Sequence, residues 1–198
     1  MIAVFDYGAG NLHSLVKALS HNDRRVQLET DIRRALRARL LVLPGVGAFS
    51  AAAARLGNER QRVRDALRDG LPCLGICLGM QLLFDASDEG AGEGIGLVAG
   101  RVTRLNATRV PQIGWNAVDA PSDSLFQRSK LRTAYYANSF VCRPDDVSSV
   151  VAWSAHEQDR YPAAIRAART LGVQFHPEKS SAPGVAFVRQ LLDDLLSD

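Results

Sequence analysis

Short apolar runs that stop at turns rich in small residues constrain the fold of this chain more than any other feature of its sequence. Such runs occupy residues 2–5, 40–43 and 73–76, and each leads into a stretch with the apolar spacing of a helix. Strands that alternate with helices in this way are typical of a mostly parallel central sheet with helices on both faces. We therefore predict an α/β fold that forms a single domain over residues 1–198.

A change of pattern in the middle of the chain predicts a different kind of structure there. Between residues 98 and 151, short β-like pieces dominate, at 101–105, around Val118, at 134–142 and at 149–153. We expect an antiparallel β addition to the parallel sheet in this region. The longer helices are expected at about 49–69, with Gly70 as the stop signal, and at about 185–196.

Composition argues against several classes of function. The net charge is +3, but the arginines alternate with acidic residues, as in 60–69, so no nucleic-acid partner is expected. No apolar stretch reaches about 18 residues and the chain does not start like a signal peptide, so we expect no membrane span and a cytoplasmic location. Cys73 and Cys77 are four residues apart without a matching second pair, so we expect no metal and no other cofactor.

The strongest local signal for chemistry is the segment Gly75-Ile76-Cys77-Leu78-Gly79, which joins an expected strand to an expected helix. A thiol at such a turn projects from the carboxyl edge of the sheet, and the helix N-terminus that follows favours the thiolate. The first amides of that helix are also suited to stabilise an oxyanion. A buried structural cysteine in an ordinary turn is the alternative interpretation of this motif alone.

A thiol nucleophile needs a base, and the base needs an orienting group. His176 follows an expected strand at 171–175, so it too should lie at the edge of the sheet. Glu178 is two residues further on, close enough to hold the imidazole in one tautomer. We therefore predict a catalytic triad of Cys77, His176 and Glu178.

A third segment, Pro44-Gly45-Val46-Gly47, ends the strand expected at 40–43. Its two glycines permit backbone conformations that are closed to other residues, including a peptide that flips between two orientations. Such a segment is able to point N–H groups at a carbonyl oxygen, although a plain loop has the same composition.

Together these segments resemble class I glutamine amidotransferases, whose signature combines the Gly-x-Cys-x-Gly turn with a late His-x-Glu. Within that class the chain is similar to the glutaminase subunits of imidazole glycerol phosphate synthases, from histidine biosynthesis. The similarity covers essentially the whole chain. Four segments carry it: Asp-Tyr-Gly-Ala-Gly-Asn at 6–11, Leu-Pro-Gly-Val-Gly-Ala-Phe at 43–49, Val-Pro-Gln-Ile-Gly-Trp-Asn at 110–116 and Gln-Phe-His-Pro-Glu-Lys-Ser at 174–180.

The resemblance implies a role for each matching position. Cys77 attacks the side-chain amide of glutamine, His176 relays protons and Glu178 orients the imidazole. The implied oxyanion-hole residues are Val46, Gly47 and Leu78. The implied substrate-binding residues are Gly45, Gln81 and Glu89, the latter two at the α-amino end, and Ser139 and Phe140, whose backbone holds the α-carboxylate. The residues implied to face a barrel-type cyclase in a heterodimer are Asn11, Trp115, Asn116 and Lys179.

The resemblance also implies the reaction. Glutamine is hydrolysed to glutamate and ammonia through a thioester on Cys77, and the cyclase uses the ammonia to form imidazole glycerol phosphate and aminoimidazole carboxamide ribotide. One position departs from the family, because Asn138 stands where a histidine is usual, which leaves its side-chain role open. Two alternatives are a glutaminase of another pathway, such as pyridoxal phosphate synthesis, and a non-enzymatic subunit that retains a relic site.

Overall fold

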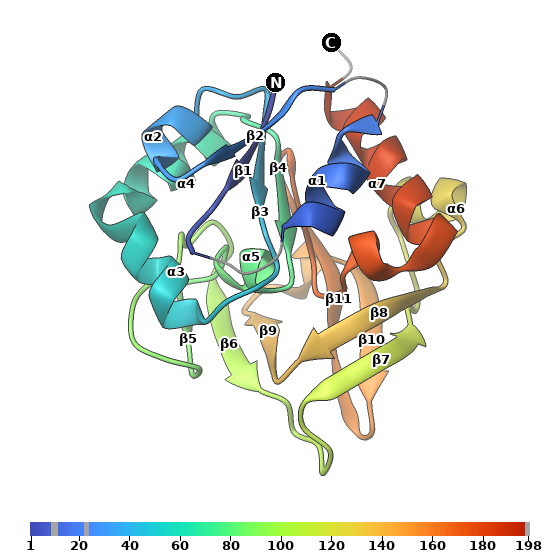
Figure 1. Cartoon of the computed structure of the whole chain (residues 1–198). Helices are drawn as coiled ribbons and strands as arrows, with labels where there is room; N and C mark the ends of the chain where they lie inside the picture. The colour runs from blue at the N-terminus through green and yellow to red at the C-terminus, as the bar shows by residue number, and fades with distance from the viewer. Residues whose placement is uncertain (9–11, 22–23, 197–198) are drawn as a thin grey trace.

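A seven-stranded sheet forms the centre of the molecule, with helices on both of its faces (Figure 1). The computed structural model describes residues 1–8, 12–21 and 24–196. The strands of this sheet are β1 (Ile2–Phe5), β2 (Val26–Glu29), β3 (Leu40–Leu43), β4 (Cys73–Ile76), β10 (Val150–His156), β11 (Asp159–Ala167) and β12 (Thr170–Val173). Their order is β10-β11-β12-β4-β3-β1-β2, and β10 and β11 join antiparallel to a parallel sheet of the other five. The predicted α/β class is confirmed.

Burial on both faces explains why the parallel strands are short and apolar throughout. Ile2 and Val4 pack into a core cluster with α1 (His13–Leu19) and α7 (Ser181–Leu196). The alternate residues, Ala3 and Phe5, belong to a second cluster on the other face. The helices of that face are α2 (Ile32–Ala35), α3 (Phe49–Leu56) and α4 (Arg60–Arg68).

The helix expected over 49–69 is interrupted in the structure. It consists of α3, a 3-10 turn at Gly57–Glu59 and α4. Gly57 has a φ of 48°, a left-handed conformation that ends the first helix, and Gly70, with a φ of 101°, follows the second as expected. The last helix, α7, begins at Ser181, four residues before the expected start at 185.

The middle of the chain forms two small additional sheets, so the expected antiparallel addition is confirmed. One sheet contains β5 (Ala86–Ser87), β6 (Gly100–Arg104) and β9 (Phe140–Pro144), and the other contains β7 (Gln112–Ala117) and β8 (Thr133–Asn138). The strand expected over 134–142 is therefore divided at Ser139, because its first half pairs with β7 and its second half with β6. The remaining elements are α5 (Leu78–Gln81), α6 (Ser124–Ser129), η3 (Val147–Ser149) and η4 (Pro177–Lys179).

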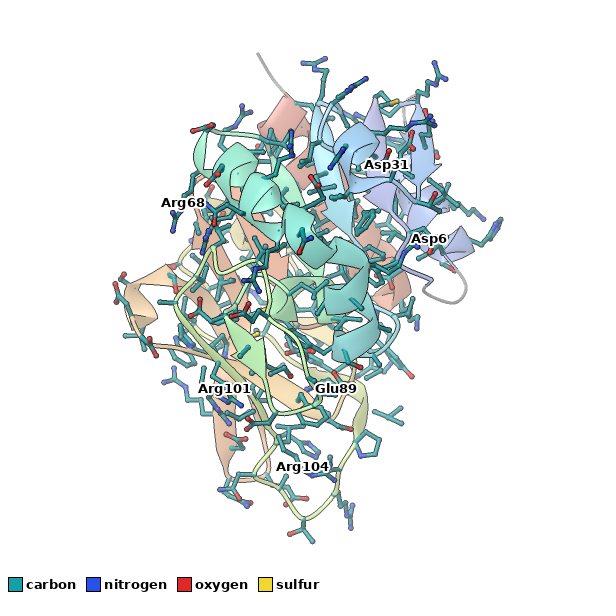
Figure 2. All side chains as sticks on the ribbon, turned by 90° about the vertical axis from the view of Figure 1, so that its left-hand side faces the viewer. Asp6, Asp31, Arg68, Glu89, Arg101 and Arg104 are labelled. Atoms are coloured by element: carbon teal, nitrogen blue, oxygen red, sulfur yellow. The ribbon has the colours of Figure 1, made fainter. Side chains whose placement is uncertain are left out.

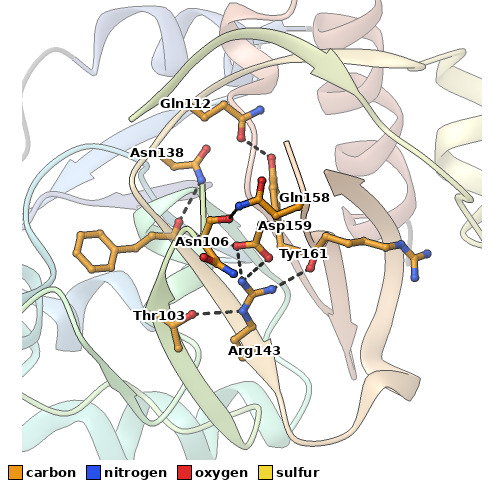
Figure 3. Close-up of polar contacts among 10 residues, drawn as sticks. Thr103, Asn106, Gln112, Asn138, Arg143, Gln158, Asp159 and Tyr161 are labelled. Atoms are coloured by element: carbon orange, nitrogen blue, oxygen red, sulfur yellow. Dashed lines mark hydrogen bonds and ion pairs between the residues drawn. The ribbon is translucent and has the colours of Figure 1, made fainter. Parts of the chain in front are cut away.

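A largely buried ion pair fastens β9 to the main sheet (Figure 3). Nη2 of Arg143, on β9, contacts the two carboxylate oxygens of Asp159, on β11, at 2.7 and 2.6 Å. Asp159 also accepts a hydrogen bond from the backbone N–H of Asn106, and Arg143 donates a second one to the carbonyl of Arg160, both at 2.8 Å. The strand that begins with Phe140 is thereby fixed relative to the central sheet.

Charged side chains of both signs are interspersed over the face formed by α2, α3 and α4 (Figure 2). Glu59, for example, pairs with Arg33 at 2.5 Å and with Arg62 at 2.9 Å. Among the helices that the structure describes, none is both long and apolar enough to cross a membrane. The described residues also include no cluster of His, Cys, Asp and Glu that could hold a metal ion.

Candidate active site

Cys77 occupies a sharp turn between β4 and α5, as the motif predicts. Its φ of 46° lies in the left-handed region, where residues other than glycine are uncommon. The flanking glycines serve another purpose, close packing: a Cβ on Gly79 would lie 2.0 Å from the carbonyl oxygen of Leu43, and one on Gly75 would lie 2.7 Å from that of Gly79. These contacts bring the start of α5 against β3 and β4, with Cys77 at the corner.

His176 reaches Cys77 because β12, which precedes it, is the parallel neighbour of β4. Nδ1 of His176 contacts Oε1 of Glu178 at 2.8 Å, and the imidazole lies near the side chain of Cys77. Burial lowers the pKa of His176, but its interactions with Cys77 and Glu178 and the negative charges of these two groups raise it, and the pKa becomes about 9. The structure thus brings the three predicted triad residues together, with Glu178 bound to the imidazole of His176 and Cys77 beside it.

The other two thiols have no comparable surroundings. Cys73 and Cys142 are fully buried, and burial raises the pKa of both thiols above the ordinary value. Cys77 is the thiol that lines a surface cleft. Reactivity of a cysteine requires both thiolate character and access, so Cys77 is the candidate nucleophile.

The cleft beside Cys77 has a volume of about 210 Å³. Such a volume suits a molecule of amino-acid size. Glu89 is held there by a hydrogen bond of 3.2 Å from the backbone N–H of Phe49, the first residue of α3. All five predicted substrate-binding residues line the cleft, together with Gly47, Leu78, Ala137 and Asn138; the five are Gly45, Gln81, Glu89, Ser139 and Phe140.

The predicted oxyanion-hole residues come from two segments, the start of α5 and the loop after β3. Leu78 is the first residue of α5, so its N–H has no acceptor within the helix. Gly47 has a φ of 121° and lines the cleft, whereas Val46 lines a second cavity, of about 200 Å³, together with Glu178 and Lys179. Gly45–Gly47 therefore separate the two cavities.

Two residues near the triad were not predicted to have a role. Nε2 of the fully buried Gln174 donates a hydrogen bond to Sγ of Cys77 at 3.4 Å, and the hydroxyl of Tyr7 donates one to the carbonyl of Pro44. Strand alternation does not indicate Gln174, because β12 ends at Val173 and the glutamine lies beyond it. Nothing in the sequence indicates the contact between Tyr7 and Pro44.

Asn138, the departure from the family pattern, is buried at the end of β8. Its Nδ2 donates to the carbonyl of Phe140 at 3.1 Å, while its Oδ1 is buried and has no hydrogen-bond partner among the described residues. The asparagine side chain thus holds the backbone at the turn through Ser139.

The predicted partner-facing residues differ in whether their side chains are free to contact a partner or are bound within the protein. Trp115 is 56% exposed, and its ring packs edge-on against Tyr135, over which Nζ of Lys179 lies at 6.0 Å. The side chain of Asn116 instead donates to the carbonyl of Ala155 at 2.7 Å and so fastens β7 to β10. Asn11 lies outside the described residues.

Comparison with known proteins agrees with this geometry. The chain matches the family model "Glutamine amidotransferase class-I" over residues 3–194. It is 40% identical to imidazole glycerol phosphate synthase subunit HisH of Thermosynechococcus vestitus over 200 residues. These aligned residues cover 96% of this chain and 95% of the HisH chain. The subunit of the same name from Leifsonia xyli subsp. xyli is 38% identical over 206 residues, 98% of each chain.

A solved crystal structure of a glutamine amidotransferase has a similar fold, with a TM-score of 0.75 at 16% identity over 98% of this chain and 99% of that one. The family model and the two relatives each span nearly the whole chain. The chain therefore belongs to the class-I glutamine amidotransferases and, within them, to the family of the imidazole glycerol phosphate synthase subunit HisH.

Proposed function

We propose that this chain is the glutaminase subunit of an imidazole glycerol phosphate synthase, which releases ammonia from glutamine for a partner cyclase of barrel architecture. The observation that supports this most is the proximity of Cys77 to the His176–Glu178 pair, beside a cleft of amino-acid size, in a chain of this family.

The first half of the reaction forms a thioester. The proton of the Cys77 thiol passes to Nε2 of His176, since Nδ1 is engaged by Glu178. The thiolate attacks the side-chain carbonyl carbon of glutamine, and backbone N–H groups near Gly47 and Leu78 stabilise the oxyanion. The imidazolium then protonates the leaving nitrogen, the C–N bond breaks and ammonia departs, which leaves a γ-glutamyl thioester.

The second half regenerates the enzyme. His176 takes a proton from water, which attacks the thioester carbonyl, and the C–S bond breaks to give glutamate. Glu178 keeps the imidazole in the orientation that both halves need. In the cyclase, ammonia is incorporated to give imidazole glycerol phosphate and aminoimidazole carboxamide ribotide.

The partner is proposed to dock on the exposed face formed by Ile113, Trp115, Tyr135 and Lys179, here called the Trp115 patch. Ile113 and Trp115 are 67% and 56% exposed and, being two residues apart on β7, share one face of that strand. Aromatic side chains such as those of Trp115 and Tyr135 are enriched at the centre of protein interfaces. The patch lies close to the site, because the backbone of Tyr135 accepts a hydrogen bond of 2.8 Å from the N–H of His176.

Replacement of Cys77 tests the proposal directly. We expect Cys77→Ala to abolish glutamine hydrolysis, since loss of a covalent nucleophile removes several orders of magnitude of rate, and to leave the fold intact. With the cyclase and ammonium salts at alkaline pH, the same variant should still make imidazole glycerol phosphate, because added ammonia bypasses the triad. Cys73→Ala is the matched control and should remain active. Normal glutamine hydrolysis by folded Cys77→Ala would refute the proposal.

A further inference from the structure

We infer that Gln174 is a catalytic residue that stabilises the thiolate of Cys77 by donating an N–H from its side-chain amide to Sγ. The inference deepens the proposed function, since it concerns the same nucleophile. Its basis is the contact of 3.4 Å between Nε2 of Gln174 and Sγ of Cys77. The side chain of Gln174 is fully buried. A hydrogen bond of this kind favours the charged form of the sulfur, because a thiolate accepts much more strongly than a thiol.

The neighbouring groups fix which end of the Gln174 amide faces the sulfur. The carbonyl oxygen of Phe140 can only accept hydrogen bonds, and it accepts one from Nε2 of Gln81 at 3.0 Å. The same Nε2 lies 3.5 Å from Oε1 of Gln174, so Gln81 presents its N–H groups to both. The oxygen of Gln174 is thereby directed toward Gln81, and its nitrogen is left for Cys77. A chain of amides thus runs from the nucleophile to the strand that carries Phe140.

Other groups near the sulfur set the background for this effect. His176 supplies the positive charge beside Cys77. Burial raises the pKa of Tyr7 and of Cys142, and the negative charge of Cys77 raises both further, so the two groups remain neutral at ordinary pH. The carbonyl of Ala137 lies 4.0 Å from Sγ and is suited to accept from a thiol but not to stabilise a thiolate. Gln174 is therefore the neutral side-chain donor directed at the sulfur among the described residues.

The test is the pH dependence of Cys77 alkylation by iodoacetamide in the isolated chain, with the alkylated residue identified by mass spectrometry. Gln174→Met keeps the size of the side chain and removes the donor. We expect the midpoint of the rate–pH curve to move up by about one pH unit, as for loss of a hydrogen bond to a charged group, so alkylation slows about 10-fold at pH values below the wild-type midpoint. Gln174→Glu should be slower still, because a carboxylate replaces the donor.

Gln112→Met is the matched control. Gln112 is another buried glutamine, but its Oε1 accepts from the hydroxyl of Tyr161 at 2.5 Å. This variant should keep the wild-type midpoint, which separates the loss of a buried amide in general from the loss of the donor at Cys77. Thermal unfolding of each variant reports on the fold, and if Gln174→Met does not fold, the Gln174→Glu comparison decides.

A wild-type midpoint in folded Gln174→Met and Gln174→Glu would overturn the inference, whatever their stability. That outcome differs from failure of the proposed function. If Cys77→Ala hydrolysed glutamine normally, the assignment of the nucleophile would fall, whereas unchanged alkylation of Cys77 in the Gln174 variants would remove only the role of the amide.

Discussion

The site depends on two glycines because their neighbours leave no room for a Cβ atom. A Cβ on Gly45 would lie 2.9 Å from Cε1 of His176 and 3.1 Å from the carbonyl oxygen of Ile76. One on Gly79 would lie 2.0 Å from the carbonyl oxygen of Leu43, a backbone atom that cannot move away alone. The first glycine therefore sets the position of the base, and the second sets how closely α5 approaches the sheet.

The raised pKa of His176 predicts how activity responds to alkaline pH. The imidazolium is needed to protonate the leaving ammonia, and with a pKa of about 9 it is lost above that pH. We expect kcat/KM for glutamine to fall about tenfold per pH unit beyond about pH 9, while alkylation of Cys77 by iodoacetamide does not fall. The free energy of unfolding also decreases at alkaline pH. The contribution of His176 to it is complete below the ordinary pKa of 6.5 and is lost as the pH rises through about 9.

Glu178→Gln is the informative variant for this prediction. It removes a negative charge and a hydrogen-bonding carboxylate from the imidazole, so the pKa of His176 should drop and the fall in kcat/KM should move to lower pH. A fall at the same pH in wild type and Glu178→Gln would mean that another group controls the alkaline limb.

Individual residues differ in how far the sequence predicts them. The sequence predicts that Cys77, His176 and Glu178 lie together, because thiol chemistry requires a base and an orienting group, and few residue types serve; their catalytic roles stay a prediction. Gln174 was not predicted, because a neutral amide has many ordinary uses and its role depends on Gln81, which reaches it from a different part of the chain. Its proposed role becomes visible only when the orientation of both amides is known.

At the scale of elements, strands and helices were predicted well where one local pattern decides them. The run over 134–142 is uniformly β-like, yet it divides at Ser139, because pairing with β7 on one side and β6 on the other is decided by distant segments. The Arg143–Asp159 pair, which fixes β9, likewise joins residues whose proximity no local pattern indicates. The division at Ser139 places a backbone turn in the wall of the cleft.

The segment Gly45–Gly47 is the element through which the partner is expected to control activity. Gly45–Gly47 separate the cleft from the cavity that Lys179 lines. We therefore expect a cyclase bound next to Lys179 to favour one orientation of the peptide within Gly45–Gly47. We expect the isolated chain to hydrolyse glutamine slowly, and the cyclase with its nucleotide bound to stimulate it about 100- to 1,000-fold, the usual worth of an oxyanion donor. Steady-state rates of the chain, the complex and the complex with nucleotide measure this.

Gly47→Pro should abolish the stimulation, because proline fixes φ near −65°, whereas Gly47 has a φ of 121°. Alkylation of Cys77 should remain largely unchanged in this variant. Equal rates in all three wild-type samples would contradict the expected control. A parallel loss of alkylation in Gly47→Pro would show that the segment supports the whole site and not only the oxyanion hole.

At the scale of the whole molecule, the Trp115 patch predicts the strength of the complex. Trp115→Ala should weaken binding of the cyclase roughly 30-fold, or about 2 kcal/mol, as expected for an aromatic residue at the centre of an interface. Titration calorimetry or surface plasmon resonance measures the change. Val147→Ala is the control, since Val147 is similarly exposed at 61%. It lies on η3, just before the first residue of β10, whereas Asn116 of β7 contacts Ala155 near the last residue of β10. Equal losses in both variants would argue against docking at this patch.

The position of β12 between β4 and β11 has a consequence for how the protein is made. During translation the Cys77 turn leaves the ribosome well before the segment that carries β12, His176 and Glu178, so the nascent chain holds a nucleophile without a base. The main sheet remains open at the same place, because β4 lacks its neighbour β12 until residues 170–173 have been synthesised. We therefore expect the proposed triad to assemble only after β12 has joined the sheet, and a chain that ends before His176 to release no ammonia.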